Sequence, residues 1–246
     1  MHARSSRPRF CIGLYLGLPL AAALAVAIAS CKGKPAPEPA ATPSAATSPE
    51  PATPVPAPPV RDDRPVIVAF GDSLTAGYGT DAGNSYPDFL EQDLNAKGFH
   101  YHVINAGVSG NTTKDGLDRL DDVLALKPVV VIAAFGGNDG LRGLPIDSTR
   151  KNFDQIVSTL QRAGIKVVLG GITLPPNYGP DYIRQFNQTY ALLARQYHVP
   201  LLPFLLQDVY GTAGSMQADG IHATSQGNQQ VARNLLPMVT PLLHKN

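Results

Sequence analysis

Short apolar segments alternate with stretches of helical periodicity from residue 65 onward, and this alternation constrains the fold more than any other feature of the sequence. The run Val-Ile-Val-Ala-Phe at 66–70 is apolar throughout, as expected of a parallel strand buried on both faces. Similar runs cover residues 102–106, 129–135, 166–172 and 199–204. Strands that alternate with helices predict an α/β fold, with about five parallel strands between two layers of helices.

Apolar side chains between these runs repeat at the three- and four-residue spacing of helices. A helix predicted over residues 153–163 ends at Gly164, and another covers residues 182–197. The last helix is expected over residues 225–243, with Pro237 ending or kinking it. In sheets of this kind, ligands bind beyond the carboxyl ends of the strands, so the loops after the strands should carry the chemistry.

Ser73 follows the first predicted strand within the segment Gly-Asp-Ser-Leu-Thr. A serine beside glycine at the edge of a sheet is placed as a nucleophile. The alternative is that its hydroxyl only caps the next helix. The segment is not the Gly-x-Ser-x-Gly elbow, because Thr75 takes the last position, and it lacks the Gly-Lys-Ser/Thr of a phosphate-binding loop.

Polar groups suited to acyl transfer follow the other strands. Asp219 stands three residues before His222, close enough to reach its Nδ1, although such pairs also occur on protein surfaces. Gly107 follows the second strand and Asn138 the third, and either segment could instead be a plain turn. Together with Ser73 these residues supply a nucleophile, a base, an orienting acid and three N–H donors for an oxyanion: the backbones of Ser73 and Gly107 and the Asn138 side chain.

Charge and cysteine content exclude several classes of protein. Residues 65–246 are near neutral and contain no run of Lys or Arg, so nucleic acid is not expected as a partner. The two cysteines, Cys11 and Cys31, both precede this range. The domain therefore has no internal disulfide, thiolate nucleophile or cysteine-based metal site.

Residues 1–30 are typical of a lipoprotein signal peptide, because three arginines precede an apolar stretch that ends in Ala-Ser-Cys. Cys31 in this context resembles the bacterial lipobox, in which the thiol receives diacylglycerol and the cysteine begins the mature chain. Ordinary signal cleavage and an uncleaved anchor are the alternatives. Lys32 in place of Asp favours sorting to the outer rather than the inner membrane.

The predicted lipidated cysteine and a tether rich in Pro and Ala occupy residues 31–64, and a single hydrolase domain occupies residues 65–246. The tether composition cannot bury a core, which predicts a disordered, partly polyproline-II spacer. The protein is therefore expected to be an exported bacterial lipoprotein, held to a membrane by its N-terminal lipid and facing the periplasm.

Four residues fall in order in segments that resemble the four blocks of the SGNH (GDSL) hydrolases: Ser73, Gly107, Asn138 and His222. Three further segments are similar to the periplasmic multifunctional acyl-CoA thioesterase/lysophospholipase/arylesterase group. These segments are Gly-Gly-Asn-Asp-Gly-Leu-Arg-Gly at 136–143, Leu-Pro-Pro-Asn-Tyr-Gly at 174–179 and Val-Pro-Leu-Leu-Pro-Phe at 199–204.

The resemblance implies a flavodoxin-like, three-layer α/β/α fold and a Ser73–His222–Asp219 triad. It also implies hydrolysis of a small-molecule ester, thioester or lysophospholipid without a metal or organic cofactor. The best-known members are soluble periplasmic enzymes, so a tether at Cys31 is a departure. Six residues in loops after the third and fourth strands are candidates for an acyl groove or for ordinary loop packing: Leu141, Leu144, Pro145, Leu174, Pro175 and Tyr178.

Three other functions compete with this interpretation. A carbohydrate or peptidoglycan O-acetylesterase would use the same triad with a more polar pocket, and a non-catalytic binding lipoprotein could use the same fold. A metallohydrolase could use His100 and His102, two residues apart on one face of a strand, but no third ligand is evident in the sequence.

Overall fold

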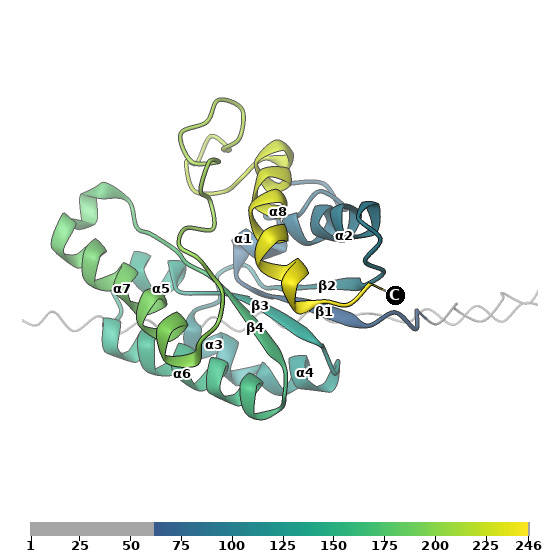
Figure 1. Ribbon diagram of the computed structural model, residues 1–246. Coiled ribbons are helices and arrows are strands. Elements are labelled where there is room, and N and C mark those ends of the chain that lie inside the picture. Colours follow the sequence, from purple (N-terminus) through teal and green to yellow (C-terminus); the bar gives the residue numbers. More distant parts are fainter. Residues whose placement is uncertain (1–61, 246) are drawn as a thin grey trace, which may run out of the picture. The chain divides into compact units, whose positions relative to one another are not determined.

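The computed structural model describes residues 62–245, and the predicted signal peptide, Cys31 and most of the predicted tether lie outside them. Within the described residues, five strands form one parallel sheet in the order β2-β1-β3-β4-β5 (Figure 1). The strands are β1 Val66–Gly71, β2 His102–Gly107, β3 Val130–Ala134, β4 Lys166–Gly170 and β5 Leu201–Leu202. The α/β fold with about five parallel strands is confirmed.

Two helical layers enclose the sheet. Figure 1 shows α2 and α8 together on one face and α3, α4, α6 and α7 on the other. The helices are α1 Ser73–Ala76, α2 Tyr86–Ala96, α3 Thr113–Asp118, α4 Leu120–Ala125, α5 Gly137–Leu141, α6 Ile146–Arg162, α7 Pro180–Tyr197 and α8 Ser225–Val239, with short 3-10 turns at Pro176–Tyr178 and Thr240–Leu242.

The central strands explain why the sequence shows continuous apolar runs rather than alternation. Every residue of β3 is buried, as are residues 67–71 of β1, because helices cover both faces. The predicted helix stripes also face the core, since Phe153, Ile156 and Leu160 of α6 are buried. Pro237 does not end the last helix, because α8 continues to Val239 before the final 3-10 turn.

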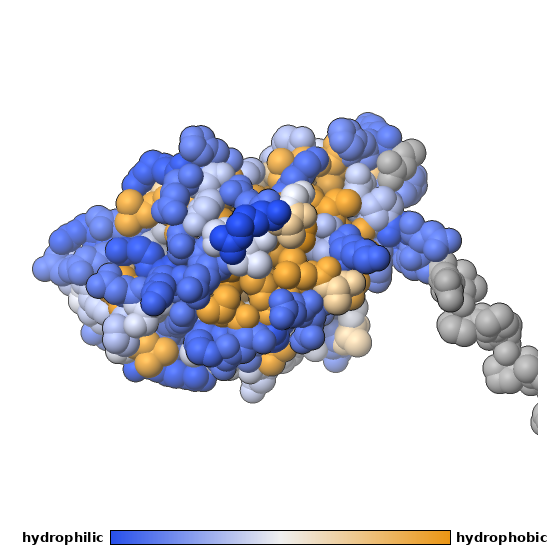
Figure 2. Space-filling view, turned by 90° about the horizontal axis from the view of Figure 1, so that it is seen from below, coloured by the Kyte–Doolittle hydropathy of each residue, from blue (hydrophilic) through white to orange (hydrophobic). Residues whose placement is uncertain are grey.

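The face of the molecule that carries α3, α4 and α6 is not uniformly polar. Figure 2 views the molecule from below, the side that carries these helices in Figure 1, and shows apolar side chains exposed between polar ones. Edge strand β2 is less covered than β1 or β3, since only Val103 of its six residues is buried. Among the described residues, no helix is both long and apolar enough to cross a membrane.

Residues just before the predicted boundary at residue 65 contact the domain. Arg64 pairs with Glu91 of α2 at 2.8 Å and donates a hydrogen bond to the carbonyl of Tyr101. Asp62 accepts three further hydrogen bonds from the same guanidinium. These contacts attach the last residues of the predicted tether to the start of the sheet.

Strand register brings three strand ends to one place. Gly71, the last residue of β1, pairs with Gly107 of β2 on one side and with Ala134 of β3 on the other. The segments that follow these strands therefore leave the same edge of the sheet side by side. Ser73 and Asn138, which were predicted as site residues, lie in the segments that leave this edge.

Candidate active site

Ser73 is the first residue of α1, immediately after β1. The turn is tight: a Cβ on Gly71 would lie 2.6 Å from the carbonyl oxygen of Ala134. The carboxylate of Asp72 caps the helix by accepting a hydrogen bond from the Leu74 N–H at 3.0 Å. Asp72 therefore caps α1, a role that Ser73 would have if it were only a capping residue. The Ser73 hydroxyl instead lies 2.9 Å from His222 Nε2.

His222 is oriented by Asp219. The imidazole Nδ1 lies 2.6 Å from Asp219 Oδ2, while Asp219 Oδ1 accepts hydrogen bonds from the N–H groups of Ile221 and His222. Partial burial acts to raise the pKa of Asp219, but the hydrogen bonds from His222 and Ile221 outweigh it and lower the pKa to about 2. An ionised Asp219 favours the tautomer with its proton on Nδ1, which leaves Nε2 to accept the serine proton.

The loop that carries His222 is tied to the segment after α1. Gln217 donates from Nε2 to the carbonyls of Tyr78 and Ala223, and its backbone N–H donates to the carbonyl of His222. The Tyr78 ring lies 4.6 Å from the His222 ring, centroid to centroid. These contacts hold the imidazole beside α1, which begins at Ser73.

Asn138 lies in the first turn of α5, after Gly136 with φ at 115°. Its side-chain amide donates one hydrogen bond, at 2.9 Å, to the carbonyl of Asn111 in the loop after β2. An amide nitrogen carries two protons, so the second remains for a ligand.

Gly107 does not fit its predicted role as an oxyanion donor. Its N–H donates to the side chain of Asn105 at 2.9 Å and is therefore engaged. A Cβ at Gly107 would lie 2.2 Å from the backbone nitrogen of Ala76, so this glycine allows β2 to approach α1 closely.

Gly110 is a candidate backbone donor that the sequence interpretation missed. It lies three residues after Gly107 with φ at 85°, and Arg142 binds its carbonyl at 2.9 Å. Asn138 binds the next carbonyl, that of Asn111. Within residues 62–245, no acceptor engages the Gly110 N–H.

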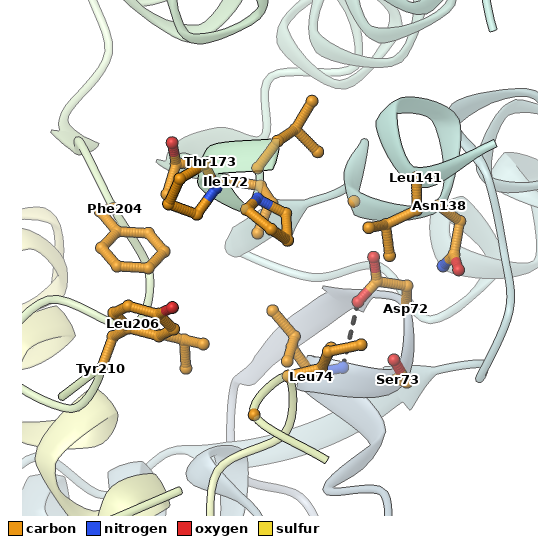
Figure 3. Close-up of a pocket in the computed structure, with 16 residues that line it drawn as sticks. Asp72, Ser73, Leu74, Asn138, Leu141, Ile172, Thr173, Phe204, Leu206 and Tyr210 are labelled. Atoms are coloured by element: carbon orange, nitrogen blue, oxygen red, sulfur yellow. Dashed lines mark hydrogen bonds between the residues drawn. The ribbon is translucent and has the colours of Figure 1, made fainter. Parts of the chain in front are cut away.

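A cavity of about 260 Å³ opens beside Ser73 and Asn138 (Figure 3). It extends between the α5 segment, the loop after β4 and the segments around β5 and before α8. Apolar side chains form most of its wall: Leu74, Leu141, Ile172, Leu174, Pro175, Pro176, Phe204, Leu206, Tyr210 and Ile221. Such a lining suits the hydrocarbon part of a substrate.

A family model described as the GDSL-like lipase/acylhydrolase family matches residues 69–230, more than half of the chain. The chain belongs to the GDSL-like lipase/acylhydrolase family.

Relatives and solved structures agree with this assignment. Esterase TesA of Pseudomonas aeruginosa is 40% identical over 178 residues, which span 72% of this chain and 89% of TesA. Thioesterase 1/protease 1/lysophospholipase L1 of Escherichia coli K12 is 36% identical over 179 residues, 72% of this chain and 85% of the relative. The crystal structure of TesA matches with a TM-score of 0.70 at 40% identity, over 72% of this chain and 99% of that one. This GDSL-family protein is an SGNH-type hydrolase of ester bonds.

Three of the six acyl-groove candidates line the cavity of this GDSL-family protein, and the other three do not. Leu141, Leu174 and Pro175 line the cavity. Leu144 and Pro145 instead line a separate hollow beside α6 and α7. Tyr178 does not line the cavity but contacts a residue that does, because its hydroxyl donates to the carbonyl of Leu141 at 2.8 Å. Leu206, Tyr210 and Ile221 also line the cavity, and they lie between β5 and α8 in a segment without periodicity. No sequence pattern therefore selects them.

The histidines of the metallohydrolase alternative do not share a strand face. His100 precedes β2, and His102 lies 3.2 Å from Glu91 in the cluster around Arg64. Over residues 62–245, no group of three or more His, Cys, Asp or Glu side chains is arranged to hold a metal ion.

Proposed function

We propose that this enzyme hydrolyses carboxylic esters and thioesters through an acyl-enzyme on Ser73. The observation that carries the proposal is the continuous hydrogen-bonded series from Ser73 through His222 to Asp219, at the mouth of an apolar cavity. A surface Asp–His pair would have neither a serine hydroxyl at 2.9 Å nor a cavity beside it.

The residues then have distinct roles. His222 Nε2 takes the proton from Ser73 Oγ as the oxygen attacks the acyl carbonyl carbon, and Asp219 stabilises the resulting imidazolium. Collapse of the tetrahedral adduct expels the alcohol or thiol, which takes the proton from His222. Water then attacks the acyl-enzyme, His222 accepts the water proton, and the carboxylic acid leaves as Ser73 regains its hydrogen.

Three N–H donors would stabilise the negative oxygen of each adduct: the backbones of Ser73 and Gly110 and the amide of Asn138. Gly110 replaces Gly107 in this set, because the Gly107 N–H is engaged by Asn105. The contact between Asn138 and the carbonyl of Asn111 supports the choice, since it holds the Gly110 loop beside the Asn138 amide.

The apolar cavity favours substrates with an acyl chain longer than acetyl, which include lysophospholipids, acyl thioesters and aryl esters of fatty acids. A carbohydrate or peptidoglycan O-acetylesterase would need room for two carbons only. The two classes separate in a series of p-nitrophenyl esters of increasing acyl length, assayed beside lysophospholipid and acyl-CoA. We expect kcat/KM to rise beyond acetyl, and a maximum at acetyl would favour the O-acetylesterase.

A fluorophosphonate probe tests the nucleophile. We expect the probe to label Ser73 and abolish turnover, and we expect Ser73→Ala to fold normally and remain unlabelled. Ser109→Ala is the matched control, because Ser109 is an exposed serine in the neighbouring loop and its loss should leave labelling intact. Labelling of a residue other than Ser73 would exclude the acyl-enzyme proposed here.

The location of the enzyme is a further part of the proposal. The Ala-Ser-Cys31 segment supports a lipid anchor, and Lys32 after it supports the outer membrane. On this basis the enzyme is an exported lipoprotein that faces the periplasm, where it meets lysophospholipids at the membrane that holds it.

A further inference from the structure

Arg119 lies between α3 and α4, outside the catalytic groups described above, and its guanidinium contacts three segments of the chain. Nη2 donates to the carbonyl of Gly71 at 2.8 Å, and Nη1 donates to the carbonyl of Ala106 at 2.9 Å. Nε donates to the side-chain oxygen of Asn111 at 2.7 Å. One half-buried side chain therefore joins the end of β1, the end of β2 and the loop after β2.

Each of these acceptors stands next to a group of the site. Gly71 precedes the Asp72–Ser73 turn. Ala106 lies near the end of β2, just before the loop that contains Gly110. Asn111 in that loop accepts a hydrogen bond from the Asn138 amide at its backbone carbonyl. The backbone N–H of Val108 shares the Gly71 carbonyl with Arg119, so two donors fasten the loop after β2 to the serine turn.

The contacts of Arg119 require the planar guanidinium of an arginine. Its guanidinium carbon lies 4.5 Å from the ring centre of Phe70 and 5.7 Å from that of Phe135. Burial lowers the pKa of Arg119, while Asp122 and Asp115 act in the opposite direction. No carboxylate of the described residues lies within 4.0 Å of it, so carbonyl dipoles and aromatic faces hold the cation. A lysine cannot make these divergent contacts, because its ammonium is a single point charge.

We propose that Arg119 is a positioning residue for the oxyanion hole: it fixes the segment that contains Gly110 and Asn111 at the correct distance from the Ser73 turn. The inference rests on the proposed function. Arg119 does not touch the substrate. It acts through the two backbone segments that supply the Ser73 and Gly110 N–H groups.

The test is a double-mutant cycle in the full chain, with kcat normalised to sites titrated by fluorophosphonate. Arg119→Lys should lower kcat roughly 10²-fold with KM nearly unchanged, because small displacements of preorganised groups are costly. In an Asn138→Ala background the same change should cost less than about threefold, because the two residues support one oxyanion hole. Arg162→Lys on the exposed end of α6 is the control and should leave kcat unchanged.

A merely structural Arg119 would give another pattern: a lower melting temperature and an equal loss of kcat in both backgrounds, or no loss per titrated site. Either result overturns the inference. If Arg119→Lys does not fold, Asn111→Ala removes only the acceptor of Nε and should show a smaller loss with the same dependence on Asn138. Full activity of Ser73→Ala would instead refute the proposed function itself.

Discussion

Asp72 and Asp139 are each 2% exposed, yet their carboxylates have different partners. Asp139 accepts hydrogen bonds from the backbone and hydroxyl of Thr113 and from the hydroxyl of Thr149. Asp72 accepts one, from the Leu74 N–H, and lines the cavity beside Ser73 (Figure 3). Burial raises the pKa of Asp72 to about 6, with Asp139 adding to the shift while Leu74 and His222 oppose it.

This difference predicts how stability responds to pH. Because the folded pKa of Asp72 lies above its usual value of 3.8, its contribution to the free energy of unfolding is full below about pH 3.8 and is lost as pH rises through 6. Asp72→Asn keeps the cap without the charge. It should therefore be more stable than the wild type by up to about 3 kcal/mol at pH 8, and equally stable at pH 3.5.

Urea denaturation at the two pH values measures the difference. Asp139→Asn is the matched control and should lose stability at both, because its new amide would face two hydroxyl donors and a backbone N–H. A stability difference for Asp72→Asn that does not change with pH would contradict the assignment.

Asn138→Ala should lower kcat by roughly 10²–10³ with KM nearly unchanged, because a donor to the oxyanion matters mainly after the carbonyl oxygen becomes charged. Asn138→Asp should be at least as damaging, since it removes the donor and places an anion beside the developing charge. Steady-state kinetics and melting temperatures of both variants separate this role from that of a turn residue. A destabilised Asn138→Ala protein with near-normal kcat would remove Asn138 from the site.

At the residue scale, the sequence was most informative where chemistry requires a particular side chain. Ser73, Asn138 and His222 could be selected because few residue types serve as nucleophile, amide donor or base. The sequence does not indicate which backbone N–H groups are free to bind an oxyanion. Gly107 was selected because the sequence does not reveal that the Asn105 side chain engages its N–H. Arg119 was not selected because it follows no strand and belongs to no motif.

The short helix α5 and the loop after β4 together shape the cavity. A Cβ on Gly140 of α5 would lie 2.4 Å from a methyl carbon of Leu174, so the absence of a side chain there leaves space for the leucine. Leu174 also lines the cavity. The volume available to an acyl chain therefore depends on the contact between these two elements.

Gly140→Ala should displace Leu174 toward the cavity, since the end of a leucine side chain moves more easily than the backbone. We expect kcat/KM for octanoyl and longer esters to fall roughly tenfold while the acetyl ester changes little. A p-nitrophenyl ester series measures both within one variant, so the acetyl ester is the internal control. An equal loss at every chain length would indicate general damage to the site instead.

At the element scale, periodicity predicted the strands and the long helices but not the cavity. The apolar runs of β1 and β3 and the stripe of α6 arise from burial, which repeats regularly along the chain. Leu206, Tyr210 and Ile221 lie in the irregular segment between β5 and α8, where position depends on tertiary contacts alone. For the same reason the sequence could not tell that Leu144 and Pro145 lie at a separate hollow.

At the scale of the whole molecule, the alternation of strands and helices was sufficient to predict the parallel sheet, and with it the edge that carries the site. The boundary predicted at residue 65 takes no account of Arg64, which pairs with Glu91 of α2, a residue distant in sequence. Lipidation at Cys31 lies outside the described residues and stays a prediction.

Cys31→Ser tests that prediction. The full chain should partition into the detergent phase of a Triton X-114 separation when expressed with its signal in a Gram-negative host, and the variant should move to the aqueous phase. Turnover of a soluble ester should be unchanged in the variant, because the substitution lies far from the site in sequence. Unchanged partitioning would exclude lipid attachment at Cys31.

His222 follows Ser73 by 149 residues, after the last strand of the sheet. During synthesis the nucleophile and all five strands therefore leave the ribosome before the base does. A chain that ends before Asp219 has the nucleophile but neither the base nor its orienting acid, so proton transfer from the serine requires the segment before α8. Hydrolysis of a chromogenic ester would therefore report that the C-terminal segment of a newly made chain has been synthesised and has folded beside Ser73.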